Sequence, residues 1–136
     1  MTATLAARLL EHARDRGDEV AIREKHRGVW REWTWARYAK RVADVAEGLR
    51  SLGVGPGSRV AIHSENRPEW VIADLAVQGL GACSVGVYPT SPAAEVESDP
   101  WVATATSFTV PSSALSSTSG RTAASAIEWK TVSPNK

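Results

Sequence analysis

The side chains that could do chemistry in this 136-residue chain are few and do not form a catalytic group. His63 follows a strand-like run, but no second histidine or paired acid stands at a metal-binding spacing, so a structural histidine is favoured. Glu65 lies in an apparent acidic cluster, yet Asn66 and Glu69, three residues apart, are explained by a capping box at a helix start. Cys83 lies inside an apolar run and is interpreted as a small buried residue. We therefore predict no catalytic residue and no metal ligand.

Residues 88–92 form the best candidate for a binding loop. They follow a predicted strand of a parallel sheet, and open α/β sheets bind ligands beyond the carboxyl ends of their strands. Tyr88, Thr90 and Ser91 are the candidate binding residues. The alternative is that the segment is only a turn into the next helix. No residue of the chain is a nucleophile with a base at hand.

Three tryptophans, Trp30, Trp33 and Trp35, stand close together and could form a platform that stacks on a ligand or a base. Their alternation in a hairpin strand favours a packing role instead. We expect them to lie in the core and at its rim.

The elements that must position these residues begin with a short helix and a hairpin. Leu5, Leu9 and Leu10 are predicted to share the buried face of the helix, and Gly17 suits its C-terminal end. Residues 20–24 and 29–34 are strand-like and flank a polar turn at residues 25–28.

Residues 35–52 have the strongest helical pattern, with Thr34 as the N-terminal cap and Gly53 at the end. Apolar residues recur there at steps of three and four. They are Tyr38, Val42, Val45, Leu49 and Leu52.

A strand at 59–63, a helix at 66–80 and a strand at 82–88 follow one another with short connections. The capping box places the start of the helix at Asn66, and Val71, Leu75 and Leu80 are available for burial. This order predicts a right-handed crossover between two parallel strands. The fold class is therefore α/β. Because a parallel sheet is covered on both faces, we expect these residues to be part of a larger, doubly wound domain.

The composition excludes several classes of protein. A hydrophobic content of 43% is that of a globular chain, and a formal net charge of +1 favours neither nucleic acid nor an anionic membrane surface as a partner. One cysteine allows no internal disulfide. The first ten residues resemble no signal peptide, and no run approaches the roughly 18 apolar residues of a membrane span. We expect a cytoplasmic protein with no integral membrane segment.

The chain divides into two parts of different composition near residue 95. Residues 1–95 contain 25 of the 31 charged residues, whereas residues 96–136 are rich in serine, threonine and alanine. Residues 100–120 contain no charge at all. Such a sequence has few anchors for a core, so residues 96–136 are predicted to be a disordered, low-complexity tail.

The first part resembles the AMP-forming acyl-CoA synthetases, most closely the bacterial long-chain fatty acid–CoA ligases. Five segments carry the resemblance, and their order and spacing make it specific. They are Ala21-Ile22-Arg23-Glu24-Lys25; Trp30-Arg31-Glu32-Trp33-Thr34-Trp35; Gly48-Leu49 through Leu52-Gly53-Val54 to Pro56-Gly57; Arg59-Val60-Ala61-Ile62 with Ser64-Glu65-Asn66-Arg67-Pro68-Glu69-Trp70; and Gly81-Ala82 through Gly86-Val87-Tyr88-Pro89-Thr90-Ser91-Pro92.

The resemblance implies the incomplete N-terminal part of an adenylate-forming, AMP-binding domain. The family's enzymes use ATP and magnesium to convert a fatty acid to an acyl-adenylate, and then pass the acyl group to coenzyme A. Their phosphate-binding loop and catalytic lysine lie beyond the segment matched by the resemblance, so we predict that the chain holds none of these cofactors by itself. Residues 118–122, Thr-Ser-Gly-Arg-Thr, resemble the start of that loop but lack the glycine and lysine that follow.

Three hypotheses remain open at this point. In the first, the chain is a truncated or frameshifted ligase, inactive alone, whose residues after Glu95 are translated out of frame. In the second, it is a non-catalytic binding or regulatory protein derived from such a ligase. In the third, it keeps the adenylation activity, alone or with a second polypeptide. Aryl and short-chain acid ligases share much of the pattern, so the long-chain assignment depends chiefly on Val87-Tyr88-Pro89-Thr90-Ser91.

Overall fold

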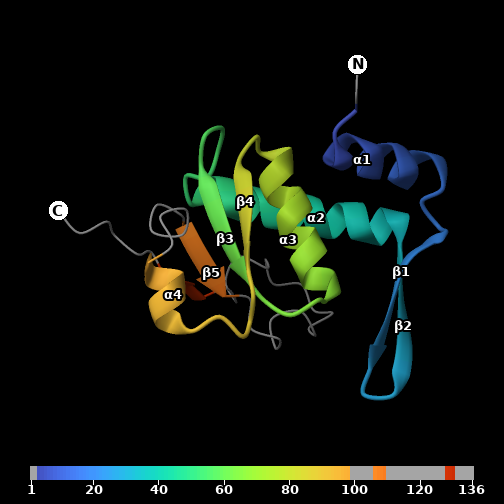
Figure 1. Cartoon of the computed structure of the whole chain (residues 1–136). Coiled ribbons are helices and arrows are strands. Elements are labelled where there is room, and N and C mark those ends of the chain that lie inside the picture. Colours follow the sequence, from blue (N-terminus) through green and yellow to red (C-terminus); the bar gives the residue numbers. More distant parts are fainter. Residues whose placement is uncertain (1–2, 99–105, 110–127, 131–136) are drawn as a thin grey trace.

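A computed structural model describes residues 3–98, 106–109 and 128–130 of the chain (Figure 1). Helices and strands alternate along most of this length. In chain order they are α1 (Leu5–Asp15), β1 (Val20–His26), β2 (Val29–Thr34), α2 (Trp35–Ser51), β3 (Arg59–His63), α3 (Pro68–Gly79), β4 (Cys83–Val87), α4 (Ala93–Ser98), β5 (Thr106–Thr109) and β6 (Glu128–Lys130).

Helix α1 begins where Thr4 Oγ1 accepts a hydrogen bond from the Ala7 N–H, at 3.2 Å. Of the three leucines predicted to be buried, only Leu9 is; Leu5 and Leu10 are exposed, so that prediction was wrong for two of them. The helix packs against α2 and α3, and Leu9 is the leucine that enters the shared core cluster, so the other two face outward.

The β1–β2 hairpin is antiparallel, with its turn at Arg27 and Gly28, both in the left-handed region (φ 49° and 82°). The strands are as predicted, with β1 two residues longer than its predicted end at residue 24. The hairpin projects from the rest of the molecule (Figure 1). Trp33 is buried and Trp35 half-buried, whereas Trp30 near the turn is exposed.

Helix α2 confirms the predicted 35–52 element and its cap, because Thr34 Oγ1 accepts a hydrogen bond from the Arg37 N–H at 3.3 Å. Its buried face includes Tyr38, Val42 and Leu49. Leu52 was predicted to belong to this face but caps the helix and is exposed. Gly53 follows with φ 87°, a conformation that glycine adopts without steric cost.

The βαβ unit is present, with β3 and β4 parallel and in register from Arg59 opposite Cys83 to His63 opposite Val87. Helix α3 connects them and packs against both strands, and α2 packs against α3. The predicted burial on α3 was one residue out of phase. Its buried residues are Pro68, Ile72, Ala73, Ala76 and Val77, whereas Val71, Leu75 and Leu80 are only partly buried.

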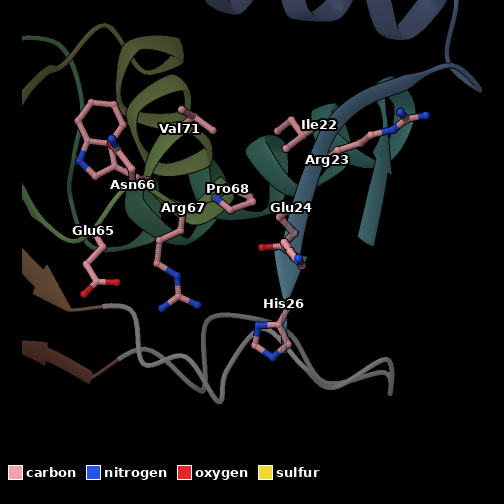
Figure 2. Close-up of a pocket in the computed structure, with 11 residues that line it drawn as sticks. Ile22, Arg23, Glu24, His26, Glu65, Asn66, Arg67, Pro68 and Val71 are labelled. Atoms are coloured by element: carbon pink, nitrogen blue, oxygen red, sulfur yellow. The ribbon is translucent and has the colours of Figure 1, made fainter. Parts of the chain in front are cut away.

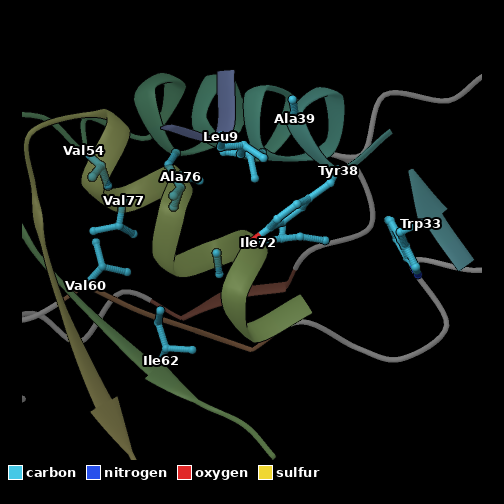
Figure 3. Close-up of a cluster of buried hydrophobic side chains, with 13 residues drawn as sticks. Leu9, Trp33, Tyr38, Ala39, Val54, Val60, Ile62, Ile72, Ala76 and Val77 are labelled. Carbon is cyan, nitrogen blue, oxygen red and sulfur yellow. The ribbon is translucent and has the colours of Figure 1, made fainter. Parts of the chain in front are cut away.

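Figure 3 shows the core between the sheet and the helices. Val60 and Ile62 of β3 meet Val77 and Ile72 of α3, and Leu9 closes the cluster from α1. Leu49, Val60 and Val77 are the largest fully buried side chains. The cluster joins α1, α2, α3 and β3, so the first 80 residues or so have one shared core.

A polar cluster connects α3 to β4 at the edge of this core. Asp74 accepts hydrogen bonds from the Ser84 hydroxyl and, at 2.8 Å, from the Gln78 amide. Tyr38 of α2 lies near the same carboxylate, and its burial, with the negative charge of Asp74, raises the pKa of the phenol to about 12.

The two remaining strands join the same sheet, whose order is β4-β3-β5-β6. β5 is parallel to β3, and β6 is antiparallel to β5. Both strands fall within the region predicted to be a disordered tail, most of which lies outside the described residues. The mixed α/β class and the partial character of the domain agree with the prediction.

Candidate functional site

The carboxyl ends of β3 and β4 lie side by side, because the two strands are parallel and in register. The residues that follow them therefore face each other across a hollow of about 460 Å³. Its lining residues are Ser64, Glu65, Asn66, Trp70, Gly86, Val87, Tyr88 and Pro89. This is the edge where open α/β sheets bind ligands.

A second hollow, of about 780 Å³, lies between strand β1 of the hairpin and the start of α3 (Figure 2). It is lined by Ile22, Arg23, Glu24, Lys25, His26, Glu65, Asn66, Arg67, Pro68, Trp70 and Val71. The two hollows share Glu65, Asn66 and Trp70. Together they form a groove that passes the N-terminal end of α3, and we call it the α3 groove.

Trp70 is the wall between the two hollows. A Cβ atom at Gly86 would lie 3.4 Å from Cζ2 of the indole, at van der Waals distance, so the ring rests directly against the end of β4. Sequence reasoning missed both residues. The available signals were a glycine inside a strand, which often marks the close approach of another group, and the tryptophan one residue after Glu69.

The start of α3 differs from the predicted capping box. The helix begins at Pro68, the capping residue is Arg67, and no side chain accepts a hydrogen bond from the first turn. The prediction placed the cap one residue early, because Pro68 at the first helical position fixes where the helix begins. Asn66 is instead exposed on the α3 groove.

Glu69 lies in the first turn of α3 and makes an ion pair with Arg67, 3.3 Å between Oε2 and Nε. Its side chain is only 13% exposed, and Oε2 accepts no hydrogen bond of good geometry. The charge of Arg67 and the positive end of the helix are what stabilise this carboxylate. Arg67 is therefore engaged within the helix start, although it lines the groove.

The predicted binding residues differ in where the structure places them. Tyr88 is 78% exposed and lines the smaller hollow. Thr90 and Ser91 line neither hollow; the Ser91 N–H donates to the Tyr88 carbonyl at 3.0 Å and forms a turn into α4.

The two residues predicted to be structural, His63 and Cys83, are both exposed. His63 is exposed at the end of β3. Cys83 is exposed, and the prediction that it is buried was wrong, because alternation with Ser84 puts its side chain on the face of β4 opposite α3.

Two polar side chains of the α3 groove are already engaged by neighbouring groups. The Ser64 hydroxyl donates to the Glu65 carbonyl at 3.1 Å, and Arg67 is paired with Glu69. Across residues 3–98 and the two short strands, no three histidine, cysteine or acidic side chains are grouped so as to hold a metal ion. Nor does any helix in the same parts of the chain have the length and apolar character to cross a membrane.

Known proteins match the chain over this same region. Long-chain-fatty-acid–CoA ligase FadD15 of Mycobacterium bovis is 43% identical over 98 residues, which are 72% of this chain and 16% of the ligase; the Mycobacterium tuberculosis enzyme gives the same values. The uncharacterized protein Rv1549 of Mycobacterium tuberculosis is 40% identical over 79 residues, 58% of this chain and 44% of that protein. The chain thus spans about a sixth of the ligases that it matches.

Solved structures show the same fold. The N-terminal subdomain of NpsA from Klebsiella oxytoca, in complex with 3-hydroxyanthranilyl-AMSN, matches with a TM-score of 0.62 and 27% identity, over 68% of this chain and 23% of that one. The structure of IdnL1 matches with a TM-score of 0.61 and 30% identity, over 66% and 18% of the respective chains. The family model described as AMP-binding enzyme matches residues 9–99, which run from α1 to the end of α4. On this evidence the chain belongs to the AMP-binding enzyme family.

Proposed function

We propose that the chain is the N-terminal segment of a long-chain fatty acid–CoA ligase. The observation that carries the proposal is the 43% identity to such a ligase over 98 residues. In the full-length enzyme, which would use magnesium, a fatty acid would react with ATP to give acyl-adenylate and pyrophosphate, and coenzyme A would then take the acyl group and release AMP. The carboxylate is activated because AMP is a far better leaving group than hydroxide. These substrates and cofactors belong to the proposal for the full-length protein.

In that proposal the described segment acts as scaffold and is inactive alone. The polar side chains at the α3 groove support this, because Ser64 and Arg67 are already engaged by neighbouring groups. None of the groove residues pairs a nucleophile with a base. Phosphoryl chemistry depends on positioned cations and backbone donors around the phosphates, and the Arg67 guanidinium of the groove is already paired with Glu69.

ATP–pyrophosphate exchange with a fatty acid tests the inactivity directly. The purified chain is expected to give no exchange above a no-enzyme background, and full-length FadD15 is the positive control. Exchange that depends on the fatty acid and is absent from a mock purification would contradict the proposal.

The division at residue 95 is part of the same proposal, with residues 96–136 translated out of frame. The end of the family match at residue 99 supports a change of character near this point. The nucleotide sequence after the codon for Glu95, translated in the other two frames, is the test. A family-like continuation in one frame is expected; its absence from both frames removes the frameshift.

A cytoplasmic location completes the proposal, on the grounds that the single cysteine, Cys83, is a free thiol and that acyl activation uses cytoplasmic ATP. Cell fractionation with an antibody to the chain checks it. Recovery in the soluble fraction of intact cells is expected, and release by osmotic shock would contradict it.

The alternative function, a non-catalytic binding or regulatory protein derived from such a ligase, is favoured by one observation. The α3 groove combines hollows of about 780 and 460 Å³ with an aromatic wall, which is a volume suited to small-molecule ligands. Calorimetric titration with a fatty acid tests it. G86V should displace Trp70 and weaken binding, whereas V29A at the hairpin tip should not. Absence of heat with the wild-type chain rejects the alternative.

A further inference from the structure

Strand β4 lies at an open margin of the sheet. The order β4-β3-β5-β6 makes it an outermost strand, and among the described residues its only partner strand is β3 (Figure 1). An unpaired edge presents a row of N–H and C=O groups that can pair with another strand. This margin is therefore a surface on which a further strand can be added.

The groups that point outward follow from the hydrogen bonding toward β3. The Cys83 N–H donates to the Ser58 carbonyl at 2.9 Å, on the β3 side. Because backbone groups alternate along a strand, Val85 and Val87 also face β3, whereas the N–H and C=O groups of Ser84 and Gly86 point away from it. Four backbone groups are thus directed at the open margin.

Nothing in the sequence of β4 protects this margin. Residues 81–88 contain no charged residue and no proline, which are the usual means of blocking strand addition. The opposite edge strand, β6, has a charged residue at each end, Glu128 and Lys130. The two margins of the sheet therefore differ, and β4 is the one suited to pairing.

We propose that β4 pairs antiparallel with β4 of a second copy of this chain, centred on Val85. In this register Ser84 and Gly86 of the partner subunit face each other and exchange both backbone hydrogen bonds, so all four outward groups on each strand are satisfied. Other antiparallel registers can also bring the outward backbone groups of the two β4 strands together. In each of them, fewer than the five residues of β4 are paired with the second copy.

The side chains agree with the same register. It places the large, exposed Tyr88 beside Ala82 of the partner subunit, and no charged residue meets another along residues 81–88. Ser84 bonds to Asp74 on the α3 side, so Cys83, Val85 and Val87 share the opposite face. A two-fold axis closes the pair, which gives a dimer rather than a filament. The proposal is independent of whether the chain is enzymatically active.

The mass in solution is the first test, by light scattering at about 100 μM chain, where micromolar pairing is populated. A dimer is expected, twice the 14.6 kDa of one chain. C83K puts a charge at the margin on an exposed position, so it should fold normally and pair at least about tenfold more weakly. C83S is the matched control and should remain dimeric. Circular dichroism verifies the folding of both variants.

Disulfide formation is the second test and reports the register. Val85 faces Val85 of the partner subunit in a non-hydrogen-bonded pair, where Cβ atoms lie about 4.5–5.5 Å apart, close to disulfide geometry. C83S/V85C should therefore form covalent dimers under mild oxidation. C83S/V29C carries a more exposed cysteine at the hairpin tip and should not. The proposal requires a wild-type dimer, weakening by C83K and the V85C disulfide; any other combination overturns it.

Discussion

The phenol of Tyr38 makes the stability of this fold depend on alkaline pH. The side chain is 8% exposed, and burial, with a smaller contribution from the charge of Asp74, raises its pKa to about 12. In the unfolded chain the same phenol has a pKa of about 10. Between these two values the folded state keeps the proton that the unfolded state loses.

The sign and size of the effect follow from proton linkage. Because the folded pKa is the higher one, the contribution to stability is fully present below about pH 10 and is lost as the pH rises toward 12. A difference of about 2 pKa units, at about 1.4 kcal/mol each, corresponds to a loss of about 3 kcal/mol from the free energy of unfolding. That is a large part of the total for a small domain.

Urea denaturation measured at several pH values between about 8 and 12 is the assay. The wild-type chain should lose about 3 kcal/mol across this interval beyond the loss shown by Y38F, which keeps the ring but cannot ionise. Y88F is the matched control, because Tyr88 is exposed, and it should follow the wild type. Since the chain has two tyrosines, Y88F also lets ultraviolet absorbance report the ionisation of Tyr38 alone.

Parallel curves for the wild-type chain and Y38F would refute the reasoning, since the alkaline loss would then come from other groups. A Tyr38 absorbance midpoint near the ordinary value of about 10 in the folded protein would refute it as well. D74N should lower the midpoint only in part, because burial is the larger cause.

Three further substitutions test the packing and the element ends by denaturant unfolding. L49A removes a fully buried side chain and should lower the free energy of unfolding by about 2–5 kcal/mol, whereas L52A, at an exposed position, should lower it by less than about 1 kcal/mol. Similar losses for the two variants would contradict a core centred on Leu49. T34A removes the cap of α2 and should cost about 1 kcal/mol, most of which T34S should restore. G53A puts a side chain at φ 87° and should cost about 1–2 kcal/mol, while G55A, with open space and no positive φ, should cost little; equal effects would show that conformation is not the cause.

The local elements were predictable because their signals are local. The helix at 35–52 was recognised from its apolar steps and from Thr34, and the hairpin from its polar turn, and both are present with almost the predicted bounds. The five segments of the resemblance were likewise readable from the chain, and the family match confirms them. Each of these inferences needs only residues within a few positions of one another.

The candidate site could not be predicted without the tertiary structure. Tyr88 was proposed as a binding residue from its position after a strand, whereas the groove is also lined by Trp70 of α3, which rests against Gly86 of β4, sixteen positions away. Periodicity carries no information about such contacts, since burial depends on which distant segment arrives at a surface.

What the sequence by itself determined is therefore the family, the α/β class and the order of the elements. The tertiary structure decided which of those elements cover each other. Leu9 is buried and Leu10 exposed because α1 packs against α2 and α3 on the side that carries Leu9. Cys83 is exposed because its side chain lies on the face of β4 opposite α3, which depends on where the helix packs. Sequence patterns set the local geometry, and only packing in three dimensions brings separate segments together around one groove.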